Sequence, residues 1–307
     1  MRRAEAFGLA ALKRSTKMEN TSTSQTPLVR LRSSLKDIGA LTVAHFNMIE
    51  EQVTLKEWTR DQTSIFTKSG ITLLCSLWEA FVEDCARDAA YHLVNNVQSE
   101  SQLPLHLRKI IAKEIKAEKN DLAPWLLASD GWRAFTIQRL ESILDKRLNR
   151  MNAPKSSNVK ELFADTVGIE DIELCWSWEL FESKEAQTWL NKFVGARGAI
   201  AHGREPDFKI GAFPLDFFTH FVAELARLTH NKIDVFLQDI GTEPIWEQEV
   251  ETMDWSLFRI FKQEEVPPEL VLIFRPKEIF PAHYAIYTKK DEGVEQSVPP
   301  KSDRAGG

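Results

Sequence analysis

The segment between residues 193 and 204, FVGARGAIAHGR, holds two side chains suited to chemistry on a phosphate diester. A histidine can accept or donate a proton near neutral pH, and an arginine stays charged and donates in a planar fork that matches phosphate oxygens. RNA cleavage without a metal ion needs proton transfer at the 2′-OH and at the departing 5′-oxygen, and a cation that stabilises the phosphorane. Arg197 and His202 are candidates for these roles.

Structural roles can explain the same two residues. The helix dipole alone favours a histidine at a helix C-terminus by ~0.3–1 kcal/mol, and Arg197 could form an ion pair with Glu185 or Asp207. On an ideal helix the two side chains lie about 140° apart, because each of the five steps turns the chain by ~100°. They would share a face if the helix distorts near its glycines, or if Arg197 reaches round on its long stem.

The elements that position these residues follow from apolar side chains that recur at steps of three and four, a pattern typical of amphipathic helices. It predicts helices over residues 35–60, 69–95, 104–119, 132–151, 183–201 and 214–240, and a short one over 122–128. Ser183 is the expected cap of the helix that carries Arg197. Residues 152–160 are predicted to form a polar loop and residues 161–182 short helical pieces, whose Trp176 and Trp178 are expected in the core.

The two ends of the chain differ from its middle. Residues 1–34 are rich in Ser, Thr and basic side chains and are predicted to form a disordered basic arm, whereas residues 35–241 are predicted to form a helical bundle. After residue 241, the runs LVLIF (270–274) and YAIYT (284–288) are rich in β-formers and are separated by prolines. The expected fold class is therefore mainly α, with a small β-containing C-terminal appendage over residues 242–307.

Composition and cysteine content indicate the cellular location of the protein. The chain has 307 residues, a formal net charge of −6 and three cysteines without a CxxC pair, which argues against a disulfide framework or a thiolate zinc site. A reducing cytoplasm is the expected location. The most apolar stretch, residues 70–82, is shorter than a membrane span, and no secretion signal is evident, so no membrane partner is expected. Met18 is an alternative start.

Positive charge is concentrated in residues 1–36 and 104–160 despite the acidic total. Lys109, Lys113 and Lys116 follow one another at steps of four and three, so they share one helix face. A solvated face is the default interpretation of this stripe, and RNA binding is the functional alternative, because local positive surface is what phosphates require.

Two motifs resemble those of the HEPN superfamily, and most closely its RiboL-PSP type. RGAIAHG at residues 197–203 is similar to the Arg-x(4–6)-His motif of HEPN ribonucleases, and LWEAFV at residues 77–82 resembles a W/L-E-x-F-V signature. The resemblance spans about residues 35–240. It implies a HEPN-type helical bundle that acts as a metal-independent endoribonuclease without a cofactor. In such an enzyme Arg197 stabilises the phosphorane and His202 moves protons.

The resemblance also implies partners. HEPN nucleases are homodimers with a composite cleft, and such a dimer brings two Arg–His pairs to one RNA substrate. Similar proteins are effectors of toxin–antitoxin or antiviral defence systems, which implies an inhibitory, antitoxin-like partner. Glu79 in the LWEAFV motif is a candidate for orienting Arg197 or His202, if its helix packs beside theirs.

One residue departs from the family pattern. The residue after the arginine is usually Asn or another polar residue, and here it is Gly198. A catalytically inactive HEPN protein that binds RNA or acts as a protein-interaction scaffold is therefore the alternative function.

Overall fold

The computed structural model describes residues 25–248, except for residues 56–59, 150, 152, 179–180, 209 and 211. This part of the chain is mainly α-helical, as predicted, and it contains no β-strand. Its α-helices are α2 Pro27–Leu55, α3 Arg60–Asn96, α4 Leu105–Ala117, α5 Gly131–Leu148, α6 Ser156–Thr166, α7 Ser183–Ala201 and α8 Ala212–Asp239. Short 3-10 helices are η2 Glu100–Gln102, η3 Ala123–Leu127 and η4 Ile172–Cys175. Residues 1–24 of the predicted arm and the two predicted strands lie outside the described residues.

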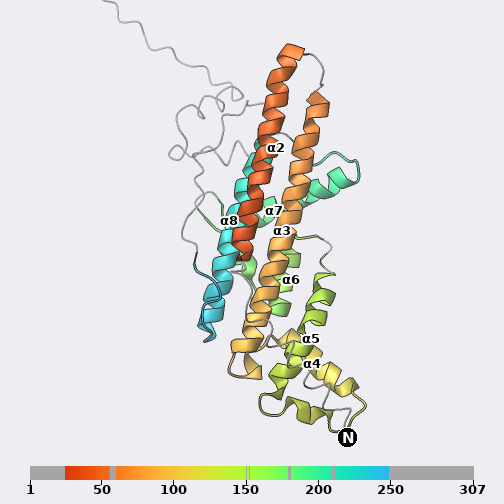
Figure 1. The fold of residues 1–307 in the computed structure, drawn as a ribbon, viewed down its shortest axis with the longest axis vertical. Helices are drawn as coiled ribbons and strands as arrows, with labels where there is room; N and C mark the ends of the chain where they lie inside the picture. Colours follow the sequence, from red (N-terminus) through yellow and green to blue (C-terminus); the bar gives the residue numbers. More distant parts are fainter. Residues whose placement is uncertain are drawn as a thin grey trace, which may run out of the picture.

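Helix α3 is the central helix of the bundle. It contacts α2, α5, α6, α7 and α8, and Figure 1 shows α2, α3 and α8 side by side along the long axis, with α4 and α5 at the lower end. The apolar stripe predicted for this helix is fully buried, and its members are Ile71, Leu74, Trp78, Phe81, Cys85 and Ala89. The bundle is thus built around the helix that carries the LWEAFV motif.

The apolar character of α3 also satisfies a length and composition test for a membrane span. Ser64–Asn96 passes that test, with 44% of its most apolar window buried inside the protein. A core helix of a soluble protein passes the same test, and α3 has the packing of a core helix.

Aromatic rings join α7 to α8. Phe193 stacks on Phe218 with ring centroids 4.9 Å apart, and the Trp189 ring meets Phe217 edge to face at 5.7 Å. Such pairs add to the hydrophobic effect of burying large rings. They fix the rotation of α7 and therefore decide which of its side chains face away from α8.

Two buried tryptophans hold loops against the helices through their indole N–H groups. Trp78 Nε1 donates to the carbonyl oxygen of Pro154 (3.0 Å), and Trp176 Nε1 donates to Thr229 Oγ1 (2.8 Å). The two rings meet edge to face at 6.1 Å. Trp176 is completely buried, which confirms its expected place in the core, and Trp178 is partly buried against Phe181.

The chain turns back onto α8 after that helix ends. The carboxylate of Asp234, which is fully buried, accepts hydrogen bonds from the backbone N–H groups of Ile245 (2.8 Å) and Trp246 (3.2 Å). The Trp246 ring stacks on His230 at 4.5 Å. The first residues of the predicted C-terminal appendage therefore pack against the helical bundle.

Helix boundaries differ from the predictions at three places. Helix α2 begins at Pro27, within the range assigned to the basic arm, because Thr26 Oγ1 accepts from the Val29 N–H (3.2 Å) and caps the helix. Helix α3 begins at Arg60 rather than near residue 69. Helix α6 begins at Ser156, inside the predicted polar loop, where the Ser156 N–H donates to Asn191 Oδ1 on α7 (3.0 Å).

Candidate functional site

Helix α7 carries both predicted catalytic residues and has the predicted bounds, Ser183–Ala201. Its N-terminus is capped by Glu182 rather than by Ser183 as expected. Glu182 and Glu185 form a reciprocal capping box, in which Glu185 Oε2 accepts from the Glu182 N–H (3.1 Å). The Ser183 hydroxyl instead donates to the carbonyl oxygen of Glu173 (2.8 Å), because η4 packs against this end of the helix.

The C-terminus of α7 has the geometry of a Schellman motif. The Gly203 N–H donates to the Ile200 carbonyl (3.1 Å), and the Arg204 N–H donates to the Ala199 carbonyl (2.8 Å). Gly203 has a φ of +63°, a conformation that glycine adopts without a steric penalty. His202 is the last residue before this turn, with φ −100° and ψ 11°. The helix therefore ends at the predicted distortion point.

His202 is exposed at this helix end. Its backbone N–H is shared between the carbonyls of Gly198 (3.2 Å) and Ala199 (3.1 Å), and its imidazole makes no hydrogen bond to any described residue. The ring is thus open to a ligand or to a second protein molecule.

Arg197 is half-buried one turn earlier and faces α3. Burial raises the pKa of the Cys75 thiol on α3 to about 12, and the positive charge of Arg197 opposes that rise while the negative charge of Glu79 adds to it. Arg197 and Glu79 are therefore both neighbours of Cys75. No hydrogen bond joins Arg197 to His202 or to Glu79 among the described residues.

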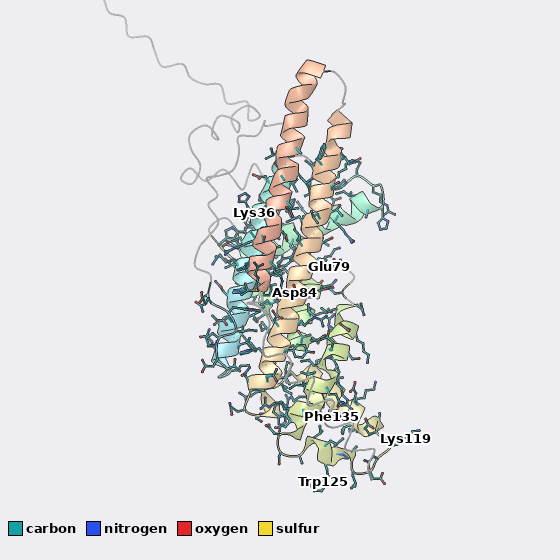
Figure 2. The ribbon with its side chains drawn as sticks, viewed as in Figure 1. Lys36, Glu79, Asp84, Lys119, Trp125 and Phe135 are labelled. Carbon is teal, nitrogen blue, oxygen red and sulfur yellow. The ribbon has the colours of Figure 1, made fainter. Side chains whose placement is uncertain are left out.

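Glu79 lines a polar cavity that does not include Arg197 or His202. It lines a cavity of about 330 Å³ between α3 and α5 with Glu83, Arg87 and Asp145, and Figure 2 shows it near the middle of the long axis. Arg87 pairs there with Glu141 and Asp145. Burial raises the pKa of Glu83, and the charge of Glu79 adds to that rise. The expected bond from Glu79 to the Arg–His pair is absent from the described part of the chain.

The lysine stripe lies on α4, at the lower end of the bundle, whereas α7 lies further up the long axis (Figure 1). Lys109, Lys113 and Lys116 are all exposed, as a solvated or RNA-binding face requires. Lys113 also lines a cavity of about 460 Å³. Within one chain the stripe and the Arg–His pair are thus separate features.

An exposed apolar cluster, which no sequence motif indicated, lies next to this stripe. Leu122, Trp125 and Leu126 in and beside η3 are 66%, 75% and 54% exposed, and Figure 2 shows Trp125 and Lys119 at the lower tip. The sequence does hold an indication of this exposed cluster, because the segment LAPWLL at residues 122–127 is apolar on every side and too short to bury all its side chains.

One comparison with known proteins agrees with the expected family. The family model described as RiboL-PSP-HEPN matches residues 36–234, which is well over half of the chain and includes Glu79, Arg197 and His202. Comparison with curated proteins and with solved structures gives no match.

Proposed function

The chain belongs to the RiboL-PSP-HEPN family, and from this premise we propose that it is a metal-independent endoribonuclease with Arg197 and His202 as its catalytic residues. One observation carries the proposal. The family's Arg-x4-His motif lies at the end of α7, where the Schellman turn leaves the His202 imidazole exposed and without a hydrogen-bond partner among the described residues.

The two side chains have complementary roles in this reaction. His202 removes the proton of the ribose 2′-OH, or returns a proton to the departing 5′-oxygen. The guanidinium of Arg197 stabilises the charge that builds up on the phosphorane. The products are a 2′,3′-cyclic phosphate, later a 3′-phosphate, and a 5′-hydroxyl end. DNA lacks the 2′-OH and is not cut.

A homodimer supplies what one chain lacks. One histidine cannot readily serve as base and acid in the same step, and two Arg–His pairs facing one cleft can divide these tasks. The exposed position of His202 at the end of α7 suits such a cleft. The lysine stripe on α4 would bind flanking RNA phosphates, away from the cleavage point.

The cellular role that follows is that of a cytoplasmic toxin–antitoxin or antiviral-defence effector. An active ribonuclease must be restrained in its own cell, so an inhibitory protein partner is part of the proposal. Masking the exposed end of α7 would be sufficient for inhibition.

The test is cleavage of a mixed RNA pool in excess EDTA by the wild type, Arg197→Ala and His202→Ala. We expect the first substitution to lower cleavage about 10²–10³-fold and the second about 10²–10⁴-fold. Lys184→Ala, at the opposite and exposed end of α7, is the matched control and should keep full activity. Circular dichroism establishes that each variant is folded. Cutting of DNA, or full activity in both catalytic variants, would contradict the proposal.

Gly198 is the observation that favours the second function, a non-catalytic RNA-binding or protein-interaction scaffold. A Cβ added at this position meets nothing within 4 Å, so the backbone leaves open space for the start of the polar side chain usual in the family. If Gly198→Asn cleaves RNA and the folded wild type does not, the protein is an RNA-binding scaffold that has lost catalysis. If the wild type neither binds nor cleaves RNA, a protein-interaction role is left.

A further inference from the structure

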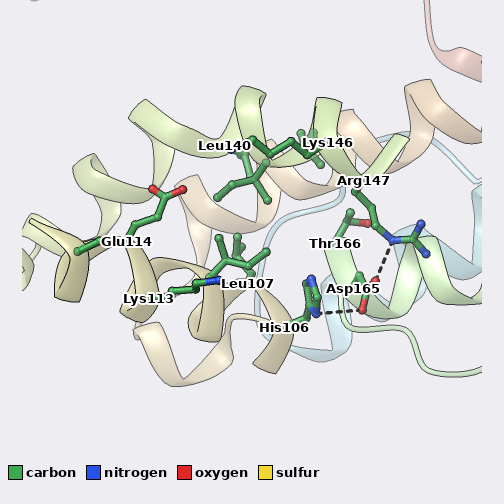
Figure 3. Close-up of a pocket in the computed structure, with 13 residues that line it drawn as sticks. His106, Leu107, Lys113, Glu114, Leu140, Lys146, Arg147, Asp165 and Thr166 are labelled. Carbon is green, nitrogen blue, oxygen red and sulfur yellow. Dashed lines mark hydrogen bonds and ion pairs between the residues drawn. The ribbon is translucent and has the colours of Figure 1, made fainter. Parts of the chain in front are cut away.

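A second cavity lies far from the Arg–His pair, between α4, α5 and α6. Its volume is about 460 Å³, within the ~300–1,000 Å³ range of small-molecule sites. Figure 3 shows Lys113 and Leu107 on one side, Leu140 and Lys146 on the facing side, and His106 with Asp165 at one end. Neither Arg197 nor His202 lines this cavity, and of the three stripe lysines Lys113 does.

Aliphatic side chains form most of its wall. Leu107 and Ile110 come from α4, and Leu140, Ile143 and Leu144 come from α5. No Phe, Tyr or Trp side chain lines the cavity, so the large aromatic platforms on which nucleobases usually stack are missing there. Leucine and isoleucine side chains that line a cavity favour an aliphatic ligand.

The charged side chains of the cavity are unevenly paired. Asp165 accepts from Arg147 Nε (2.8 Å) and lies 3.4 Å from His106 Nδ1, and Glu114 pairs with Arg139 (2.8 Å). Both carboxylates therefore have a cationic partner.

Lys113 and Lys146, by contrast, have no ion-pair partner among the described residues. They come from two different helices and border the same cavity. After internal pairing, the cavity retains two positive charges above an aliphatic wall. An anion is the complementary ligand group.

We propose that this cavity binds an amphiphilic organic anion: an aliphatic chain lies against the wall shared by α4 and α5, and a carboxylate or phosphate head is held by Lys113 and Lys146. Half-exposed His106, 3.4 Å from Asp165, is a further polar group at one end of the same cavity. Such a ligand would bridge α4 to α5. This proposal is independent of the proposed cleavage chemistry, because neither Arg197 nor His202 lines the cavity.

The experiment is isothermal titration of the full chain with decanoate and with decyl phosphate, and with two partial ligands. Decanol has the chain without the charge, and acetate has the charge without the chain. We expect both decyl anions to bind at least about ten-fold more tightly than either partial ligand, since a charge-assisted hydrogen bond is worth about that factor. The tighter of the two anions identifies the head group.

Variants locate the binding. Lys113→Met together with Lys146→Met should weaken decanoate about ten-fold and leave decanol binding unchanged, whereas the matched pair Lys109→Met and Lys116→Met, outside the cavity, should change neither. Ala117→Trp at the cavity rim should block entry, and Ala134→Trp on the exposed side of α5 should not.

Three results would overturn the proposal. The first is that the folded wild type does not bind decanoate. The second is that decanoate binding survives both Ala117→Trp and the Lys113/Lys146 double substitution. The third is that guanosine monophosphate binds more tightly than decanoate at the same cavity. The last would indicate a nucleotide site instead of an aliphatic one. RNA cleavage by the same preparations is measured separately, so failure here leaves the ribonuclease proposal intact.

Discussion

At the scale of single residues, the LWEAFV motif divides into a structural part and an accessible part. Trp78 and Val82 are completely buried and Phe81 nearly so, whereas Glu79 is only partly buried. Trp78 does more than fill space, because its indole N–H satisfies the carbonyl of Pro154 in the loop before α6. The motif therefore stabilises the bundle, and Glu79 is its candidate for a role at the surface.

Replacing Trp78 with phenylalanine tests this structural role. Trp78→Phe keeps an aromatic ring but leaves a small cavity and a buried carbonyl without its donor, so we expect the free energy of unfolding to fall by about 1–3 kcal/mol. Trp125→Phe is the matched control, since that side chain is 75% exposed and should change stability by less than about 0.5 kcal/mol. Urea unfolding followed by circular dichroism measures both. An equal loss of stability in Trp78→Phe and Trp125→Phe would contradict the structural role of Trp78.

The thiols give a pH-dependent prediction at the same scale. Burial raises the pKa values of Cys75 and Cys175 to about 12 and that of Cys85 well above its ordinary value of 9.0. The native thiols should therefore react with iodoacetamide far more slowly than the unfolded chain at pH 8.5, because only the thiolate reacts. Their contribution to stability is fully present below pH 9 and is lost as the pH rises from about 9 to 12.

Mass spectrometry of the alkylated cysteines, native against urea-unfolded, checks this prediction. Rapid labelling of Cys75 in the folded protein would mean that the Arg197 neighbourhood is open to solvent. Arg197→Ala removes the charge that favours the Cys75 thiolate, so labelling of Cys75 in that folded variant should be slower still.

At the scale of elements, the sequence predicted the helix that carries the site and missed how that helix is held. The bounds of α7 were predicted correctly, because a C-terminal glycine followed by proline stops a helix by local chemistry alone. The N-cap of α7 and the start of α6 were predicted wrongly. Each depends on a contact that forms only in the folded chain, Ser183 with Glu173 at the N-cap and Ser156 with Asn191 at the start of α6. The start of α2 was hidden by a basic, serine-rich composition, although Leu28 and Leu31 are buried.

The two glycines near the end of α7 provide a matched pair for the C-terminal turn. Gly203→Ala places a Cβ at a φ of +63° and should lower stability by about 1 kcal/mol, although nothing lies within 4 Å of the new atom. Gly195→Ala, in the exposed helical part of α7 with equally open surroundings, should raise stability by about 0.5–1 kcal/mol. Thermal unfolding distinguishes the signs, and two changes in the same direction would contradict the Schellman turn.

At the scale of the whole molecule, sequence reasoning could name the candidate residues but not their arrangement. Arg197 and His202 share one helix end, as their spacing indicates, whereas Glu79 faces the hollow between α3 and α5 and the lysine stripe lies on α4. These relations depend on how α3, α4 and α7 are rotated about their axes. The proposed composite cleft would add a further relation, between residues of two chains, which neither one sequence nor the structure of one chain contains.

Subunit mixing tests that relation directly. Arg197→Ala and His202→Ala chains, co-expressed with different tags and purified through both, form a mixed dimer with one intact arginine and one intact histidine. If the two chains share one cleft, the mixed dimer should cleave RNA more than either parent variant but less than the wild type, because its cleft holds one arginine and one histidine where the wild type holds two of each. Sedimentation equilibrium of the wild type should show a dimer.

The control for this experiment is a mixed dimer in which neither chain can supply the group that the other lacks. A mixed dimer of Arg197→Ala with the doubly substituted Arg197→Ala/His202→Ala chain contains no intact arginine and should stay as inactive as Arg197→Ala alone. If the first mixture is also inactive while the wild type cleaves RNA, each Arg–His pair acts within its own chain. Arg197 and His202 of a single α7 would then act together on one phosphate, and the dimer would contribute no catalytic group across the two chains.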